Sequence, residues 1–252
     1  MIGFTKFCSQ FAFTEDGGGL VGVEREAFLL RDGKIAPIAE EVLRRLPDHT
    51  RYGYELSACQ LEDRIGPTSI SKLMERLLVN EEEIGRAEKA LGFKRLYQEV
   101  APPDMPLDIY PDPTGRYQRI TKDMPHHILS AACRVTGTHI HIGMPNAKAA
   151  LRIYNKAVLH YEVLCEMGDG SSGERLKIYK TMAPDYQPFQ YKTWEAFHAE
   201  AVNKGFDEDP RKCWHLIRIS KHGTIEFRMF GATHDLNKIV AWATRCHEIC
   251  FG

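Results

Sequence analysis

Three short segments of this chain alternate apolar and polar residues, and this alternation constrains the fold more than any other feature. The segments are residues 22–30, 138–143 and 224–230. Successive side chains of a β-strand point to opposite faces, so each segment is predicted to be a strand with one apolar and one polar face. The apolar faces suit packing beneath helices. We therefore expect an α+β fold in which helices cover one face of a sheet.

The third of these strands has a hairpin partner at residues 214–220. If residues 221–223 form a three-residue loop that ends in a left-handed glycine, Arg218 faces Glu226 across the hairpin. A two-residue turn would instead set Arg218 against Phe227 and mix the polar and apolar faces. The three-residue register is the prediction, because it keeps polar residues opposite polar residues.

Helical periodicity marks two longer segments. Residues 69–91 carry apolar side chains at helical spacing, and a second helix is predicted to begin after Asn146, a good N-cap, and to run towards Gly168. A third helix is expected at residues 194–203. The proline-rich residues 101–115 should form an extended surface loop.

Acidic residues recur on the polar faces of the predicted strands. Residues i and i+2 of a strand share a face and lie about 6.5–7 Å apart. Three pairs share a face in this way: Glu24 with Glu26, His139 with His141, and Glu226 with Arg228. The segment 54–62 adds Glu55 and Glu62, which are seven residues apart and face together only if a bulge or turn intervenes.

This set of side chains is typical of a site for hard divalent cations. Neighbouring carboxylates repel one another unless they are protonated or bridged by cations. Several glutamates with one imidazole suit Mg²⁺ or Mn²⁺ better than zinc, and such ions usually hold phosphate oxygens, so a nucleotide is the natural co-ligand. Arg218, Arg228 and Arg134 would then neutralise phosphate or a substrate carboxylate. The candidate metal ligands are Glu24, Glu26, Glu55, Glu62, His139 and Glu226.

Three other signals are weaker. Residues 17–22 match G-x-G-x-x-G but precede a predicted strand and open no helix, so a dinucleotide site is not expected there. The adjacent His126 and His127 have no acid nearby. Cys246 and Cys250 lie four apart and allow a zinc site, but buried thiols are the preferred interpretation.

Charge and composition limit the class of protein. The net charge of −1 and the pI near 6.8 give no electrostatic reason to expect nucleic acid or an anionic membrane as a partner. No apolar run approaches the ~18 residues of a membrane helix, and no secretion signal begins the chain. Seven cysteines without a CxxC pair fit reduced thiols. We expect a cytoplasmic protein forming one domain over residues 1–252.

Taken together, the motifs resemble the glutamate–cysteine ligase type 2 family, also called carboxylate–amine ligases, of the glutamine-synthetase-like superfamily. The resembling segments are GVEREAFLL at 22–30, ELSACQLEDRIGP at 55–67, GRYQRI at 115–120, RVTGTHIHIG at 134–143 and WHLIRISKHGTIEFRMFGA at 214–232. Their order follows the family over roughly residues 20–235. The resemblance implies a strongly curved antiparallel sheet whose concave face holds ATP, Mg²⁺ and a glutamate-like acid.

The resemblance also implies an activity and residue roles. ATP would phosphorylate a carboxylate, and an amine would displace the phosphate to form an amide, with amino acid and amine as small-molecule substrates of a homo-oligomer. The six candidate metal ligands keep that role by motif position. The catalytic candidates are Glu226 and Arg228. The candidates for cofactor binding are Arg218, Arg134 and Arg175, and those for substrate binding are Arg116 and His141.

Other functions stay open at this point. A non-catalytic nucleotide- or peptide-binding member would keep the same sheet. An ATP:guanidino phosphotransferase would show more arginines and fewer metal acids. His139 and His141 alone would also suit a metal-dependent hydrolase. The chain stops at Gly252, earlier than members of that family usually do, so a substrate pocket completed by another subunit, or loss of ligase activity, are further alternatives, and the two substrates stay open.

Overall fold

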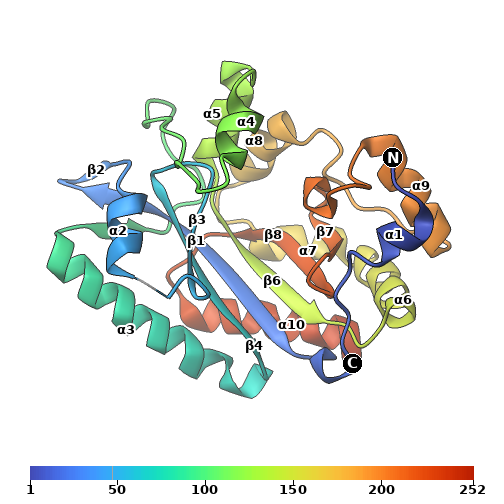
Figure 1. The fold of residues 1–252 in the computed structure, drawn as a ribbon. Coiled ribbons are helices and arrows are strands. Elements are labelled where there is room, and N and C mark those ends of the chain that lie inside the picture. The colour runs from blue at the N-terminus through green and yellow to red at the C-terminus, as the bar shows by residue number, and fades with distance from the viewer. Residues whose placement is uncertain (47) are drawn as a thin grey trace.

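An open antiparallel sheet forms the centre of the computed structural model, which describes residues 1–46 and 48–252 (Figure 1). The strand order along its main path is β3-β4-β1-β6-β8-β7. These strands are β1 (Val21–Arg31), β3 (Tyr52–Tyr54), β4 (Gln60–Thr68), β6 (Gly137–Gly143), β7 (Ile217–Ser220) and β8 (Thr224–Gly231). Two short strands, β2 (Lys34–Ile35) and β5 (Lys94–Leu96), also pair with β1.

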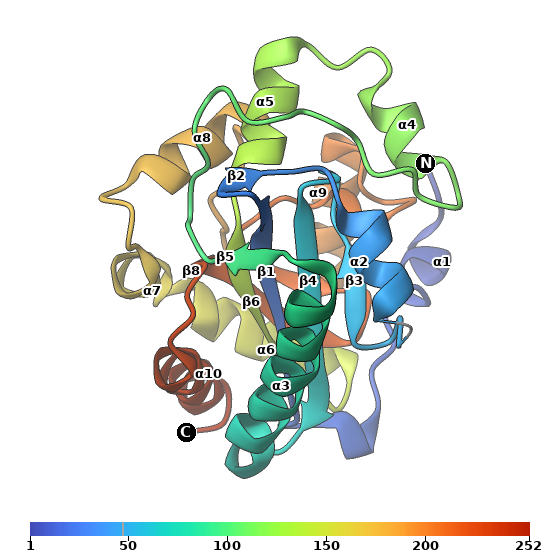
Figure 2. The ribbon, with the colours of Figure 1, turned by 90° about the vertical axis from the view of Figure 1, so that its left-hand side faces the viewer.

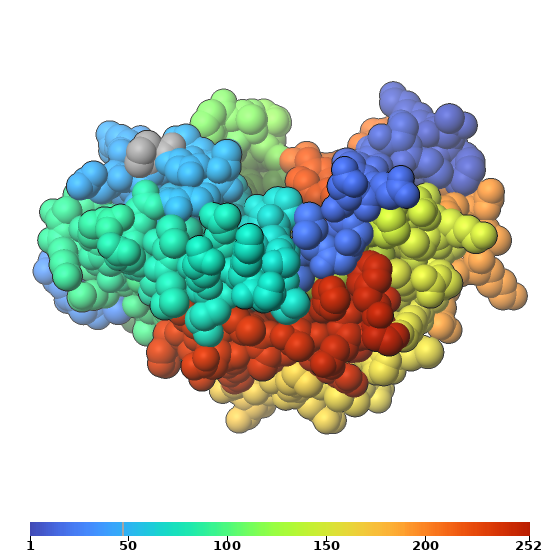
Figure 3. All heavy atoms as spheres, turned by 90° about the horizontal axis from the view of Figure 1, so that it is seen from below, coloured from blue at the N-terminus to red at the C-terminus, as the bar shows by residue number. Residues whose placement is uncertain are grey.

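Helices cover the apolar face of the sheet, as the alternation predicts. In Figure 2, α3 lies in front of β4 and β1, and in Figure 3 α10 runs beside α3 with α6 and α7 next to it. The helices are α1 (Phe4–Cys8), α2 (Ala39–Arg45), α3 (Leu73–Leu91), α4 (Arg116–Thr121), α5 (His126–Arg134), α6 (Ala147–Val158), α7 (Tyr161–Gly168), α8 (Glu174–Met182), α9 (Trp194–Lys204) and α10 (Leu236–Phe251). The 3₁₀ turns are η1 (Glu15–Gly17), η2 (Ile70–Lys72) and η3 (Pro210–Lys212). No helix among the described residues is long and apolar enough to span a membrane.

The hairpin of β7 and β8 has the predicted register. Arg218 pairs with Glu226 and Ser220 with Thr224, and Gly223 adopts a φ of +72° in the loop between them. The three-residue loop therefore keeps both arginine and glutamate on the same face of the sheet. This face, which carries Glu24, Glu26, His139, His141, Glu226 and Arg228, is called the polar face below.

The predicted helices are confirmed with one correction. Residues 69–91 form η2 and α3, and α6 begins after Asn146, whose side chain accepts a hydrogen bond from the Ala149 N–H. The second helix was expected to continue to Gly168, but the structure divides it into α6 and α7. Gly168 lies so close to Phe230 of β8 that a side chain there would collide. The last residue of α7 thus packs closely against β8, a contact that the uninterrupted helical periodicity does not reveal.

Behind the acids of the polar face, the opposite face is not wholly apolar. Arg25 lies between Glu24 and Glu26 on β1, and it is only 1% exposed beneath α3. Its guanidinium contacts Asp63, the residue directly opposite on β4, and lies 2.8 Å from a Glu81 oxygen of α3. Buried ions are retained only when they are paired, so this ion pair fixes β1 against β4 directly behind the polar side chains.

The Arg25→Met variant is expected to lose about 3–5 kcal/mol of the free energy of unfolding, because Asp63 would be left buried without its partner. Urea unfolding followed by circular dichroism measures the change. Arg86→Met is a matched control, because Arg86 pairs with Glu82 on the exposed surface of α3 and should contribute less than about 1 kcal/mol. Equal losses in the two variants would contradict a structural role for the buried pair.

Candidate metal centre on the polar face

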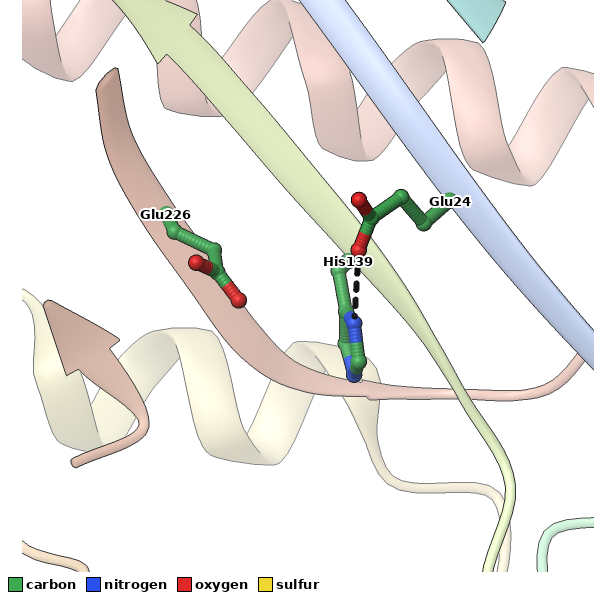
Figure 4. A group of neighbouring side chains, drawn as sticks. All are labelled: Glu24, His139 and Glu226. Carbon is green, nitrogen blue, oxygen red and sulfur yellow. Dashed lines mark hydrogen bonds and ion pairs between the residues drawn. The ribbon is translucent and has the colours of Figure 1, made fainter. Parts of the chain in front are cut away.

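Three neighbouring strands bring Glu24, His139 and Glu226 together (Figure 4). Glu24 of β1 pairs directly with His139 of β6, and the next strand, β8, supplies Glu226. Each offers one ligand atom, and these atoms all lie within 4.8 Å of one another. His139 Nδ1 is 3.3 Å from Glu24 Oε2. These three residues are the first ligand group.

A second ligand group consists of Glu26, Glu55 and Glu62, whose ligand atoms also lie within 4.8 Å of one another. Glu26 of β1 pairs directly with Glu62 of β4. Glu55 follows the end of β3, and the chain turns before β4 begins at Gln60. This turn brings together two glutamates that are seven residues apart, as the sequence argument requires. The structure thus places all six candidate metal ligands in two compact groups.

The two groups differ in their electrostatics. Burial, followed by the charge of Glu26, raises the pKa of Glu55 to about 7. Burial and the charges of Glu24 and Glu55 raise the pKa of Glu62 well above its ordinary value, although Arg64 also contacts Glu62. A cation bound by the second ligand group would replace these protons, so the crowding of carboxylates there favours a metal.

The first ligand group is already surrounded by positive charge. Burial alone would raise the pKa of Glu24, but His141 and His139 hold it well below its usual range. For Glu226 burial is likewise outweighed, in this case by Arg218 and Arg228, which lower its pKa. Three donors in each group, mostly carboxylate oxygens, suit Mg²⁺, which keeps its other positions for water or phosphate.

Arg218 and Arg228 converge on the same glutamate. Arg218 donates from Nε and Nη2 to the two oxygens of Glu226, at 2.7 and 2.9 Å. Arg228 also donates to Glu226, while its own Nε is buried with no hydrogen-bond partner among the described residues. A buried donor without a partner is uncommon and suits a site that awaits a ligand.

His141 is oriented by its neighbour on β8. Its Nδ1 lies 2.8 Å from Thr224 Oγ1, and its Nε2 is 3.5 Å from Glu24 Oε2 without the alignment of a hydrogen bond. Burial lowers the pKa of His141, but Glu24 and Glu226 more than offset this and raise it. The imidazole therefore tends to carry a proton beside the first ligand group.

The remaining predicted arginines lie in different surroundings. Arg175 was expected to bind cofactor, but it is 3% exposed and donates to the backbone carbonyls of Thr136, Met229 and Arg228. These bonds direct its guanidinium to the sheet itself, which corrects the expected role. Arg134 donates from Nε to the Ala101 carbonyl, and Arg116 lies over the Tyr117 ring on α4. No hydrogen bond or ion pair joins either of these two to the ligand groups within residues 1–46 and 48–252.

A cavity of about 390 Å³ borders the first ligand group. It lies where β1 and β8 begin and β6 ends, and Glu24 and His141 form part of its wall. Apolar side chains and glycine backbone make up much of the rest. Examples are Leu20, Ile65, Pro67, Gly17, Gly143 and Gly223. Residues 17–20 precede β1 as expected, and Gly17, Leu20 and Gly22 line this cavity, which their spacing does not reveal.

Two polar residues at the site, Arg64 and Glu99, were not among the residues predicted from the sequence. Arg64 is two residues beyond Glu62 on β4, so the same i, i+2 rule could have found it. Glu99 lies outside every alternating segment and had no such signal. The discounted residues lie elsewhere: Cys246 and Cys250 are buried thiols of α10, and His126 and His127 are exposed on α5.

Known proteins resemble this chain in sequence. A family model described as "Putative amidoligase enzyme" matches residues 109–250. "Putative glutamate--cysteine ligase 2-2" of Mycobacterium sp. (strain KMS) is 27% identical over 191 residues, which cover 74% of this chain and 50% of that protein. "Putative glutamate--cysteine ligase 2" of Leifsonia xyli subsp. xyli is 24% identical over 265 residues, which cover 94% and 68%. The chain spans about half the length of the first curated relatives it matches.

Solved structures share the fold at low sequence identity. A bifunctional glutathione synthetase from Pasteurella multocida matches 93% of this chain and 42% of its own, with a TM-score of 0.57 and 14% identity. Plasmodium falciparum glutamine synthetase matches 98% and 54%, with a TM-score of 0.50 and 12% identity. The family model covers more than half of the 252 residues. The chain therefore belongs to the amidoligase enzyme family and has a glutamine-synthetase-like fold.

Proposed function

We propose that this chain is the catalytic domain of an ATP- and Mg²⁺-dependent carboxylate–amine ligase that acts on a glutamate-like acid. The observation that carries the proposal is the pair of ligand groups on adjacent parts of the polar face, with Glu226 held by two arginines. The names of the relatives support glutamate as the acid and cysteine as the first amine to test.

The six ligands would hold the metal in two places. Glu24, His139 and Glu226 would bind one ion, and Glu26, Glu55 and Glu62 a second. Bound Mg²⁺ would neutralise the negative oxygens of the nucleotide and the acid. The proposal extends to Mn²⁺, because carboxylate oxygens with one imidazole also suit that ion.

The nucleotide would occupy the cavity beside the first ligand group. The apolar wall formed by Leu20, Ile65 and Pro67 suits a base, and Glu24 and His141 lie at the same cavity. A protonated His141 would donate from Nε2 to a phosphate oxygen, while Thr224 holds the other ring nitrogen. The phosphates would then point along the polar face towards the second ligand group.

Arg228 would stabilise the phosphoryl group during transfer. Its Nε has no hydrogen-bond partner in the part of the chain that the structure describes, and its contact with Glu226 orients the guanidinium. Arg218 donates hydrogen bonds to both oxygens of Glu226. It would therefore position that carboxylate and add positive charge to the site. Both guanidinium groups are already ordered before the reaction. They can therefore stabilise the negative charge that develops in the transition state without the cost of reorganisation.

The reaction would proceed in two steps. A carboxylate oxygen of the acid attacks the γ-phosphorus of ATP, and ADP leaves. The neutral nitrogen of the amine then attacks the acyl carbon, inorganic phosphate leaves, and the amine loses a proton to solvent. The chain need not supply a nucleophile, and Cys59, the cysteine between Glu55 and Glu62, is buried and its thiol faces the Pro106 carbonyl.

An ATP turnover screen across amino acids and amines tests this function, with ADP release and amide formation scored together. Formation of both products is expected. A phosphorylated acceptor without an amide would indicate a phosphotransferase, and metal-dependent cleavage without ATP would indicate a hydrolase. Light scattering of the purified protein tests the proposed homo-oligomer.

Mg²⁺ is expected to raise the melting temperature of the protein, and to do so more strongly at high pH. The pKa of Glu55 is about 7, raised first by burial and then by Glu26. Below this pH a metal must displace the proton of Glu55, so affinity rises as the pH rises through about 7. Thermal unfolding with and without Mg²⁺ at about pH 5.5, 7 and 8.5 measures the effect.

The Glu55→Gln variant should show a weaker pH dependence, since an amide does not titrate, and the part that remains comes from Glu62, whose pKa is also raised. Glu75→Gln on the exposed side of α3 is the matched control and should keep it. Stabilisation by Mg²⁺ that is the same at all three pH values in the unchanged protein would contradict the assignment of Glu55 as a ligand.

A further inference from the structure

The end of the polar face farthest from the cavity is built around two facing glycines. Gly137 begins β6 and pairs with Gly231 at the end of β8, whereas the cavity lies at the opposite ends of these strands. A side chain on Gly231 would collide with the Glu99 carboxylate, and one on Gly137 would collide with the Arg175 guanidinium. Glu99 and Arg175 therefore occupy the space above this glycine pair.

This glycine end adjoins the second ligand group. The Gly137 N–H donates to Glu26 Oε2 at 2.7 Å. Burial lowers the pKa of Arg175, and the charges of Glu26 and Glu99 are among those that oppose this shift, so the guanidinium lies near both carboxylates. A molecule whose carboxylate reached the second ligand group would thus have its other end close to Glu99.

The two carboxylate oxygens of Glu99 differ in their hydrogen bonding. Its Oε1 accepts a hydrogen bond from the Gly170 N–H at 2.7 Å. Its Oε2 is buried and has no hydrogen-bond partner among the described residues. Leaving a buried carboxylate oxygen without a partner is costly, so its retention at the glycine end of the polar face points to a ligand that donates to it.

We propose that Glu99 binds the ammonium group of the acid substrate, and hence that this substrate is an amino acid. The inference rests on the proposed ligase function and assigns the glycine end as the site of the acid. An ammonium group offers three donors, and a charged pair gives the strongest hydrogen bond available to Oε2.

The ammonium belongs to the acid rather than to the attacking amine. A carboxylate in contact with an amine favours the protonated form of that amine, which has no lone pair with which to attack. Glu99 would therefore hinder an acceptor amine but would anchor an amino group that takes no part in the reaction. The acid substrate would therefore lie beside Glu99, and the attacking amine would bind elsewhere on the polar face.

A purely structural role for Glu99 would be to tether the loop that follows α7. That loop already has its own tether, because Asp169 accepts hydrogen bonds from the N–H groups of Ser171 and Gly173. The Glu99→Gln variant keeps a carbonyl oxygen for the Gly170 N–H and removes only the charge. It therefore separates loss of the tether from loss of ammonium recognition.

The experiment compares each amino diacid with the same diacid lacking its amino group: L-glutamate with glutarate, and L-aspartate with succinate. Calorimetry in the presence of Mg²⁺ gives Kd, and ADP release gives KM and kcat. Glu99→Gln is expected to raise Kd and KM for the preferred amino diacid by about tenfold to a hundredfold, and to leave the values for its partner within about twofold. Glu174→Gln, an exposed glutamate of α8, is the control and should change neither.

Equal weakening of both members of a pair would mean that Glu99 only supports the loop, and no change for either would mean that it does not contact substrate. Both results overturn the proposal. If the unchanged protein binds the amino diacid through Glu99 but forms no amide from it, the proposed ligase function fails while the recognition role stands. If kcat/KM for amide formation from the amino diacid is unchanged in Glu99→Gln, the recognition role fails alone.

Discussion

Replacement of Glu226 by glutamine is expected to lower kcat by about a hundredfold to a thousandfold, although the side chain keeps its size. The change removes a charged ligand from the first ligand group and the counter-charge of both Arg218 and Arg228. The two guanidiniums would then repel each other next to the transferred phosphoryl group. Steady-state ADP release at saturating ATP, Mg²⁺ and acid measures the loss.

Circular dichroism must show that the Glu226→Gln protein is folded at the assay temperature. Glu82→Gln is the matched control, since Glu82 lies on the exposed surface of α3 with 74% of its side chain accessible, and its activity should stay within about twofold. A folded Glu226→Gln protein with near-normal kcat would rule out the proposed role of this carboxylate.

The Arg228→Lys variant is expected to lose about a hundredfold to a thousandfold in kcat with little change in the Kd for ATP. Lysine keeps the charge but cannot donate both to Glu226 and, through a second nitrogen of a planar group, to the phosphoryl oxygen. The loss should therefore fall on the transition state, where negative charge builds up on the transferred group. Kinetics give kcat, and calorimetry with a non-hydrolysable ATP analogue gives the Kd.

Arg86→Lys serves as the control for this change, because Arg86 pairs with Glu82 on the exposed surface of α3 and 63% of its side chain is accessible. Its kcat should stay within about twofold. A rise in the Kd for ATP as large as the fall in kcat would instead place Arg228 in ground-state nucleotide binding.

The alternation of polar and apolar residues predicted much of the site, because the period of a strand fixes which side chains share a face. It placed Glu24 with Glu26 and His139 with His141, and the hairpin register then put Arg218 opposite Glu226. Periodicity could not predict which strands are neighbours in the sheet. Glu24 lies beside His139 because β1 and β6 are neighbours, and that order depends on the packing of the whole sheet.

Other features had no local signal. Arg25 occupies a position that alternation assigns to the helix-covered face, and its charge is tolerated only because Asp63 and Glu81 meet it from other elements. Arg175 looked like a ligand-binding residue in a glycine- and serine-rich segment, yet the chain folds so that its donors reach backbone carbonyls of the sheet. Glu99 acquires its position through long-range packing against Gly231. Contacts between distant residues of this kind leave no periodic trace in a sequence.

Transfer of oxygen from the acid to phosphate is the most direct test of an acyl-phosphate ligase. The acid is labelled with ¹⁸O in its carboxylates and incubated with ATP, Mg²⁺, the amine and the protein, and the released phosphate is analysed by mass spectrometry. One ¹⁸O atom is expected in each phosphate, because the attacking carboxylate oxygen stays with the phosphorus when the amide forms. Unlabelled phosphate released together with ADP would show hydrolysis by water and would contradict the proposed ligase mechanism.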